Sequence, residues 1–334
     1  FYEQPLLAQL QPIAGIAARL EGFNSTTLAT AERTSQLGRV TALQITTQVI
    51  GLAASVILAL TLQSVWALVL GYLVGALSMA VLSHIVLNGH RDRFVFYAGH
   101  ARSILGFGSY IFIASIAGFI IAQGDRAILG KITTLEELAL YNIAFFLASV
   151  PVMLARAMID KIIFPLYSRR PTWESFENRK KIALARYVVT SGGIAALMVF
   201  SFIGEPFVEL LYDSRYHDAG QFVVLISLAL MPGLVTASYM VLALAAGQSG
   251  RFAVMAVSGA VVQTLCMLLG GSWYGVVGVA GGLALAPFLY HPITVALTWK
   301  YRGWDPVHDL LFGVVICAFA AFHVAQGTLA YFGL

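Results

Sequence analysis

The chain has 334 residues, of which 59% are hydrophobic and only 11% are charged, and its mean hydropathy is +0.82. Soluble domains carry about 25% charged residues, so this composition excludes an ordinary soluble protein and indicates a chain that crosses a membrane several times. Two cysteines in apolar runs and seven scattered histidines offer neither a disulfide framework nor metal-ligand spacing.

Long apolar runs separated by short connections follow one another along the whole chain. Each run is close to the roughly 20 residues that an α-helix needs to cross a bilayer. We therefore predict an all-α fold, a polytopic transmembrane helical bundle of about ten spans. The predicted spans are 5–30, 39–62, 65–88, 104–123, 138–163, 182–204, 219–246, 251–270, 275–298 and 308–331.

The basic residues alternate between the two ends of these spans. Fifteen of the 20 Lys and Arg residues fall in connections on one side, at 31–39, 88–103, 160–186, 247–251 and 299–309. The opposite side holds only Arg126, Lys131 and Arg215. By the positive-inside rule, this asymmetry places the first group of connections in the cytoplasm. The net charge of +4 is therefore interpreted as a topology signal and not as a nucleic-acid-binding patch.

Three predicted helices carry polar side chains along one face of their apolar runs. At about 100° per residue, each set falls on one stripe of its helix. The stripes are Gln4, Gln11, Arg19, Thr26, Thr30 and Arg33 along the span 5–30 and the residues that flank it; Thr41, Gln44, Gln48, Gly51 and Ser55 in 39–62; and Asn142, Ser149, Arg156 and Asp160 in 138–163. Because an unsatisfied polar group in lipid costs free energy, we expect the three stripes to line one shared, water-accessible cavity.

The charged residues of these stripes have structural as well as functional interpretations. Arg19 is either an ion-pair partner within the bundle or a ligand of the substrate. Arg156 precedes Asp160 by four residues, a spacing that permits an ion pair across one helical turn. Glu21 is either close to the end of its span or a protonated acid with a coupling role.

Two further features are interpreted mainly as structural. Asp125 and Arg126 are expected to cap or tie an outer loop at 124–137. The last spans, 251–331, are interpreted as scaffold, and His291-Pro292 as a helix kink and not a ligand. The sequence shows no catalytic constellation, so we expect no enzyme activity, no cofactor and no metal.

An ordered series of short motifs carries a family resemblance. The series contains GDR at 124–126, LG at 129–130, YNIA at 141–144, Pro151, FPLYS at 164–168 and, earlier in the chain, ATAER at 29–33 and VWAL at 65–68. In order and spacing it resembles the oligosaccharide flippases, the Wzx-type exporters of lipopolysaccharide and other polysaccharides in the MOP superfamily. Compared with that family, we expect the chain to be N-terminally incomplete and to lack about three spans.

The resemblance implies a two-lobed exporter that divides in the 88–103 loop. Residues 1–95 would form a partial N-terminal transmembrane lobe and residues 96–334 the C-terminal lobe. The implied function is a flippase that moves undecaprenyl-diphosphate-linked oligosaccharide across the bacterial inner membrane by alternating access. Its product would serve surface polysaccharide biosynthesis, as O-antigen, capsule or exopolysaccharide. The implied partners are this lipid-linked substrate, membrane lipids and polysaccharide polymerase or assembly proteins, with no nucleic acid.

Such a substrate suggests roles for the polar stripes. Guanidinium groups pair with phosphate in a forked geometry, which suits Arg19 and Arg156 to the diphosphate. The amide and hydroxyl side chains suit sugar hydroxyls; they are Gln44, Gln48, Asn142 and Ser149. The remaining charged residues are candidates for coupling or gating, namely Glu21, Asp125, Arg126 and Asp160.

Two alternative functions stay open. A lipid II or multidrug exporter of the same superfamily would share the architecture. A membrane-embedded polysaccharide polymerase or ligase is less favoured, because such enzymes are expected to carry a large outer loop rich in Arg and His. The outer loops predicted here, 124–137 and 205–218, are short and mainly acidic.

Overall fold

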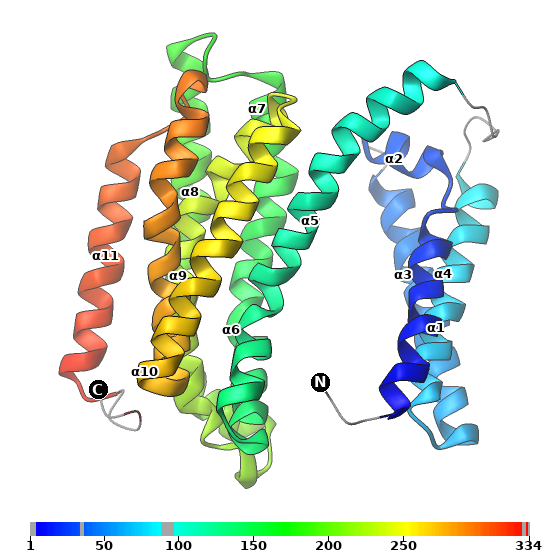
Figure 1. Ribbon diagram of the computed structural model, residues 1–334, viewed down its shortest axis with the longest axis horizontal. Helices are drawn as coiled ribbons and strands as arrows, with labels where there is room; N and C mark the ends of the chain where they lie inside the picture. The colour runs from blue at the N-terminus through cyan, green and yellow to red at the C-terminus, as the bar shows by residue number, and fades with distance from the viewer. Residues whose placement is uncertain (1–4, 34–36, 88–96, 329–331, 333–334) are drawn as a thin grey trace. The chain divides into compact units, whose positions relative to one another are not determined.

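The computed structural model describes residues 5–33, 37–87, 97–328 and 332 (Figure 1). Within these residues every regular element is a helix, and eight helices are long and apolar enough to cross a membrane. The predicted all-α, polytopic membrane bundle is therefore confirmed. The α-helices are α1 Pro5–Glu21, α2 Thr26–Arg33, α3 Leu37–Leu62, α4 Trp66–Val86, α5 Ala98–Ile132, α6 Leu135–Met158, α7 Phe164–Arg169, α8 Phe176–Leu211, α9 Ala219–Ala245, α10 Ser249–Thr298 and α11 Pro306–Ala325.

Contacts divide the chain into two compact units, Phe1–Tyr97 and Ala98–Leu334. Helices α1 to α4 belong to the first unit and α5 to α11 to the second. The predicted lobe boundary at 88–103 falls largely outside the described residues, and the assignment of the lobes stays a prediction.

In the first unit, α4 packs against both α1 and α3. Small residues allow α3 and α4 to approach closely: a β-carbon at Gly71 would lie 1.9 Å from the Ser55 hydroxyl oxygen. Close contact through small residues is typical of helix pairs in membranes. Ser55 and Gly51 of the predicted α3 stripe thus face α4 and not a cavity.

The predicted span 5–30 is wrong as a single helix. Helix α1 ends at Glu21, a turn follows, and α2 begins at Thr26. The turn contains Gly22, Asn24 and Ser25, residue types that favour turns and helix N-termini over helix interiors. The stripe predicted from Arg19 to Arg33 is therefore interrupted, and Gln4 lies outside the described residues.

Helix α9 forms the centre of the second unit. It packs against α6, α8, α10 and α11 and buries apolar side chains on all sides, as expected for a helix that is hydrophobic all round. In Figure 1 it runs through the middle of the unit, while α11 lies at its edge.

Helix α10 contains two predicted spans, 251–270 and 275–298, folded as an antiparallel hairpin. The helical backbone breaks at Tyr274 and Gly275, and Gly275 has a φ of 58°, a region that favours glycine. The two arms touch through their backbones, because a β-carbon at Gly278 would lie 1.8 Å from the Gly270 carbonyl oxygen.

The predicted outer loop 124–137 is also wrong. Helix α5 continues through the polar residues 123–126 to Ile132, and Leu129 beyond them is fully buried. Only Thr133 and Thr134 separate α5 from α6, and the Thr134 hydroxyl accepts a hydrogen bond from the Glu137 amide as an N-cap. The predicted connection 160–186 contains α7 and the beginning of α8, and α8 continues through the first half of the predicted outer loop 205–218.

Connections that the charge pattern places on one side do meet at one end of the second unit. The Thr172 hydroxyl donates to the Tyr301 carbonyl oxygen at 2.5 Å, and the Arg251 guanidinium donates to the Leu297 carbonyl oxygen at 2.6 Å. At the other end, the Gln221 side-chain amide donates to Glu205 at 3.3 Å. The assignment of the first end to the cytoplasm stays a prediction.

Candidate functional site

The polar stripe of α6 points away from the core of its own unit. Asn142 and Ser149 are half-buried, and Arg156 is exposed. The buried residues of α6 lie on the roughly opposite face of the helix, given about 100° per residue; they are Leu140, Tyr141, Ala144, Leu147, Ala148, Pro151 and Ala155. An exposed arginine and two half-buried polar side chains therefore share the face of α6 that lies opposite its buried residues.

Asp160 does not pair with Arg156. Both side chains are exposed, and no ion pair joins these two described residues, so the ion pair that their spacing permitted is absent. Asp160 lies beyond α6 in a π-helical turn, Ile159–Ile163, where the Phe164 amide bonds to the Ile159 carbonyl. A wider turn changes the angular spacing of residues, and Pro165, which has no amide hydrogen, follows it. Such turns recur at functional sites.

Asp125 and Arg126 lie inside α5, so the prediction that they cap a surface loop is wrong. Asp125 is 1% exposed, and its Oδ2 accepts a hydrogen bond from the Tyr141 hydroxyl at 2.7 Å. The Arg126 Nε donates to Asn142 Oδ1 at 2.9 Å, and its guanidinium lies 4.4 Å from the centre of the Phe145 ring. These contacts tie α5 to α6 and place Arg126 beside the first residue of the α6 stripe.

The candidate residues of the first unit are exposed. Arg19 lies near the end of α1, and Gln44 and Gln48 lie on α3. Glu21 accepts a hydrogen bond from the Tyr72 hydroxyl at 3.1 Å, which links α1 to α4. The cavity that these residues would share with the α6 stripe stays a prediction.

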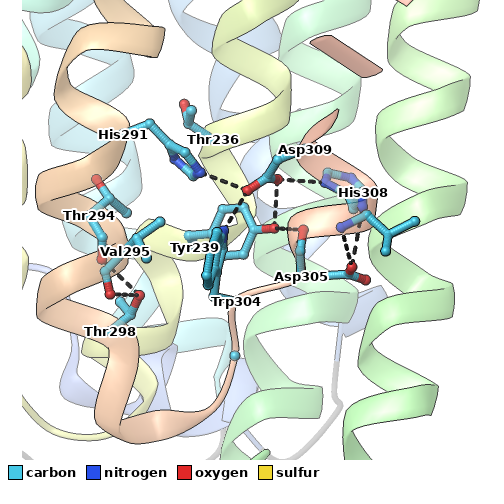
Figure 2. Close-up of polar contacts among 12 residues, drawn as sticks. Thr236, Tyr239, His291, Thr294, Val295, Thr298, Trp304, Asp305, His308 and Asp309 are labelled. Carbon is cyan, nitrogen blue, oxygen red and sulfur yellow. Dashed lines mark hydrogen bonds and ion pairs between the residues drawn. The ribbon is translucent and has the colours of Figure 1, made fainter. Parts of the chain in front are cut away.

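A second polar cluster lies at the beginning of α11, and Figure 2 shows it around Asp309. Four donors meet the Asp309 carboxylate. The Tyr239 hydroxyl donates at 2.7 Å and His308 Nδ1 at 3.0 Å to Oδ1. His291 Nε2 donates at 2.7 Å and Trp304 Nε1 at 2.8 Å to Oδ2. These five residues are the Asp309 cluster.

Arg186 supplies the positive charge beside this cluster. Its side chain is 1% exposed, and it donates to the Tyr167 hydroxyl at 2.6 Å and to the Gly303 carbonyl at 2.8 Å. Its guanidinium lies 4.0 Å from the centre of the Tyr239 ring, whose hydroxyl bonds to Asp309. Removing one member of such a buried charged group costs about 3–5 kcal/mol, so the cluster fastens α7, α8, α9, α10 and α11 at one end.

The Asp309 cluster was not predicted from the sequence. Arg186 was counted among the charges of the connections, His291 was interpreted as part of a kink, and residues 251–331 were assigned to the scaffold. The only local signal is Asp305-Pro306, an N-cap followed by proline in the first helical turn, which marks the beginning of α11. The partners come from separate helices, so no sequence spacing relates them.

The far end of α11 is also attached through a histidine. His323 is 1% exposed and bonds to Ser201 of α8 at 3.1 Å and to Thr328 at 2.8 Å. A cavity of about 360 Å³ opens beside it, lined by Ser201, Phe202, Glu205, Gln221, Val224, His323, Gly327 and Thr328. Polar contacts therefore attach α11 to the bundle at both ends.

Comparisons with known proteins agree with this architecture. A structure described as "Lipid II flippase MurJ, inward closed conformation" is similar to the chain with a TM-score of 0.59 and 13% sequence identity, covering 84% of this chain and 67% of that one. At this identity the likeness concerns the fold alone. No curated protein matches the chain. The family model described as "Polysaccharide biosynthesis protein" matches residues 1–221. The chain is a multi-pass membrane protein and belongs to this polysaccharide biosynthesis family.

Proposed function

We propose that the protein is a Wzx-type flippase that moves undecaprenyl-diphosphate-linked oligosaccharide across the bacterial inner membrane for surface polysaccharide biosynthesis. The observation that carries this proposal is the polar stripe of α6, which faces away from the core of its unit. A charged side chain in a membrane span faces a bundle interior or a water-filled cavity far more often than lipid. In a chain of the polysaccharide biosynthesis family, that cavity is suited to a lipid-linked sugar.

The role of each candidate residue follows from the chemistry of the substrate. Arg156 and Arg19 bind the diphosphate, because a guanidinium stays charged and pairs with phosphate oxygens through two parallel hydrogen bonds. The polyprenyl tail remains in the lipid, so its apolar surface is never transferred into water. Sugar hydroxyls bond to the amide and hydroxyl groups of Gln44, Gln48, Asn142 and Ser149.

Alternating access moves the site from one side of the membrane to the other as two helical lobes rock against each other. The candidates for coupling or gating are the charged residues that tie helices together or lie beside the stripe. Glu21 links α1 to α4, and Asp125 and Arg126 link α5 to α6. Asp160 lies in the π-helical turn that follows the stripe.

Export of lipid II is the second candidate, and the fold similarity to the lipid II flippase MurJ favours it. Lipid II also joins a sugar to a polyprenyl diphosphate, so the same arginines would serve.

Deleting the gene and identifying the lipid-linked intermediate that accumulates, by mass spectrometry of membrane lipids, tests the two substrates. We expect undecaprenyl-diphosphate oligosaccharide to accumulate and surface polysaccharide to disappear. Accumulation of lipid II with normal surface polysaccharide would support the second candidate. If no lipid-linked sugar accumulates, both fail.

A further inference from the structure

The Asp309 carboxylate is saturated with donors. An ionised carboxylate only accepts hydrogen bonds and offers about four lone-pair positions. Two N–H or O–H donors meet each oxygen, from Tyr239 and His308 at Oδ1 and from His291 and Trp304 at Oδ2. An additional proton or a metal ion would therefore have to displace an existing partner from Asp309.

His308 also has partners for both ring nitrogens. Its Nδ1–H donates to Asp309, and its Nε2 pairs with the Thr190 hydroxyl at 3.1 Å. The ring is fully buried and contacts the rings of Tyr187 and Phe312. Charging this imidazole would place a cation among aromatic rings without any access to water.

His291 differs from His308 in both respects. Its Nε2–H donates to Asp309, but its Nδ1 is buried and has no hydrogen-bond partner. The His291 side chain as a whole is 17% exposed. In the neutral imidazole, Nδ1 carries a lone pair that can accept a proton.

The residue after His291 is a proline, which changes the hydrogen bonding of this turn of α10. Pro292 has no amide hydrogen, so it cannot donate to the carbonyl oxygen of Phe288, four residues earlier. Helical side chains lean toward the N-terminus, so the ring of His291 lies over the turn that holds this carbonyl. The proline that marks a kink thus leaves one carbonyl of the preceding turn without its usual helical donor.

We propose that His291 is a proton-binding site, in which Nδ1 takes up the proton and the Asp309 carboxylate stabilises the imidazolium through a charge-assisted hydrogen bond. The ionisable groups that face the site are Tyr167 of α7, Arg186 and Tyr187 of α8, Tyr239 of α9, Asp305 of the connection, and His308 of α11. Of these, Arg186 opposes a second positive charge.

Proton uptake at His291 is thereby linked to the connection between α10 and α11. Arg186 holds this connection through the Gly303 carbonyl, and Asp309 holds it through the Trp304 indole. A proton on His291 and the Arg186 guanidinium are both stabilised by the negative charge of Asp309. Charging His291 therefore changes the contacts that Arg186 and Asp309 make with this connection. This step moves one proton and no other group, and it does not depend on which lipid-linked sugar is exported.

Trp304 provides the readout, because the indole N–H of Trp304 and the imidazole Nε2 of His291 both bond to Oδ2 of Asp309. We would titrate the tryptophan fluorescence of the purified full-length protein in lipid nanodiscs. Subtracting the Trp304→Phe variant removes the signal of the other tryptophans, of which the chain has five in total. We expect a single transition whose steepness corresponds to one proton.

Two matched variants identify the histidine. His291→Gln keeps a donor at the position of Nε2 but cannot take up a proton, so the transition should be lost. His308→Asn keeps a donor at the position of Nδ1, so the transition should remain. The proposal is wrong if the parent protein shows no transition, or if the transition survives in His291→Gln.

A measurement on the unmodified protein covers the case in which either variant fails to fold. Deuterium exchange at the imidazole C2 position, followed by mass spectrometry of the peptide that contains His291, reports the titration of this ring directly. A sigmoidal rate profile with the same midpoint as the fluorescence transition supports the proposal, and a flat profile overturns it.

Discussion

Arg156 shows at the scale of one residue how a side chain can be stable in a membrane helix and still be available to a ligand. It is exposed, and it forms no hydrogen bond or ion pair with another described residue. An arginine at the centre of a lipid-facing helix costs about 2.5–3.5 kcal/mol on insertion scales. A water-filled cavity removes most of that cost and leaves the guanidinium free to bind phosphate.

We predict that Arg156→Ala lowers polysaccharide export about 10- to 100-fold, which corresponds to the loss of charged hydrogen bonds worth about 1.5–3 kcal/mol. Lysine at this position should restore part of the activity, because it keeps the charge and loses the fork. The measurement is surface polysaccharide per unit of protein in the membrane.

Asp160→Asn is the matched control, because Asp160 is exposed and unpaired with Arg156. It should leave the amount of protein in the membrane unchanged, alone and in combination with Arg156→Ala. If Arg156→Ala lowers protein abundance and Asp160→Asn restores both abundance and export, Arg156 is structural.

The Asp309 cluster shows the limit of sequence reasoning at the same scale. Its histidines and Arg186 look unremarkable in the sequence, because each is a single polar residue within or beside an apolar run. Periodicity relates residues of one helix only, whereas the donors of Asp309 come from α9, α10, α11 and the connection before α11. The α6 stripe was visible because all its members lie on one helix.

At the scale of helices, the contact between α5 and α6 depends on a buried carboxylate. Asp125 has one hydrogen-bonded oxygen, bound to the Tyr141 hydroxyl, and one buried oxygen without a partner. Tyr141 is itself fully buried. The tie is therefore sensitive to the loss of a single hydroxyl group.

We predict that Tyr141→Phe destabilises the protein by about 1–3 kcal/mol, since it leaves both oxygens of a buried acid unsatisfied. Thermal unfolding in detergent measures the effect. Adding Asp125→Leu to Tyr141→Phe removes the acid that has lost its partner, so the double variant should melt above Tyr141→Phe alone. Equal melting of the parent and Tyr141→Phe would contradict this account.

The α10 hairpin depends on the absence of side chains at its crossing point. A β-carbon at Gly278 would overlap the Gly270 carbonyl, while nothing lies within 4 Å of a β-carbon at Gly281. We predict that Gly278→Ala lowers stability by at least the roughly 1–3 kcal/mol typical of overpacking, whereas Gly281→Ala is neutral or slightly stabilising. The ratio of folded to aggregated protein in fluorescence-detected size-exclusion chromatography distinguishes the two, and similar profiles would count against a tight crossing.

Hydropathy predicted where the helices lie but not where they end. The runs that became α3, α4 and α9 were placed within a few residues, because lipid requires an unbroken apolar segment. Helix ends were wrong where a helix continues beyond the apolar run, as α5 does to Ile132 and α8 to Leu211. Charged residues such as Asp125 suggested loops, because a hydropathy value treats each residue alone. It does not include a hydrogen-bond partner on the next helix, such as Tyr141.

At the scale of the whole molecule, the charge asymmetry makes a topological prediction. Glu174 lies in the connection between α7 and α8, and Asp213 lies beyond the end of α8; both side chains are exposed. We predict that a cysteine at Asp213 reacts with a membrane-impermeant thiol reagent applied to intact cells, and that a cysteine at Glu174 reacts only after the cells are opened. Serine would replace Cys266 and Cys317 beforehand. The reverse labelling pattern would invert the assigned topology.

The hydrogen bond between Arg186 and the Gly303 carbonyl has a consequence for the timing of biosynthesis. The two residues are 117 positions apart in the chain. At a translation rate of about 5–20 residues per second, the ribosome adds the acceptor roughly 6–23 s after it has added the arginine. Throughout that interval α8 already carries a cation that has no carbonyl at position 303 to receive it, and Asp309 has not been synthesised. Of its hydrogen-bond partners only the Tyr167 hydroxyl is already present, so we expect the nascent helix to keep Arg186 at the membrane–water interface until α11 is synthesised.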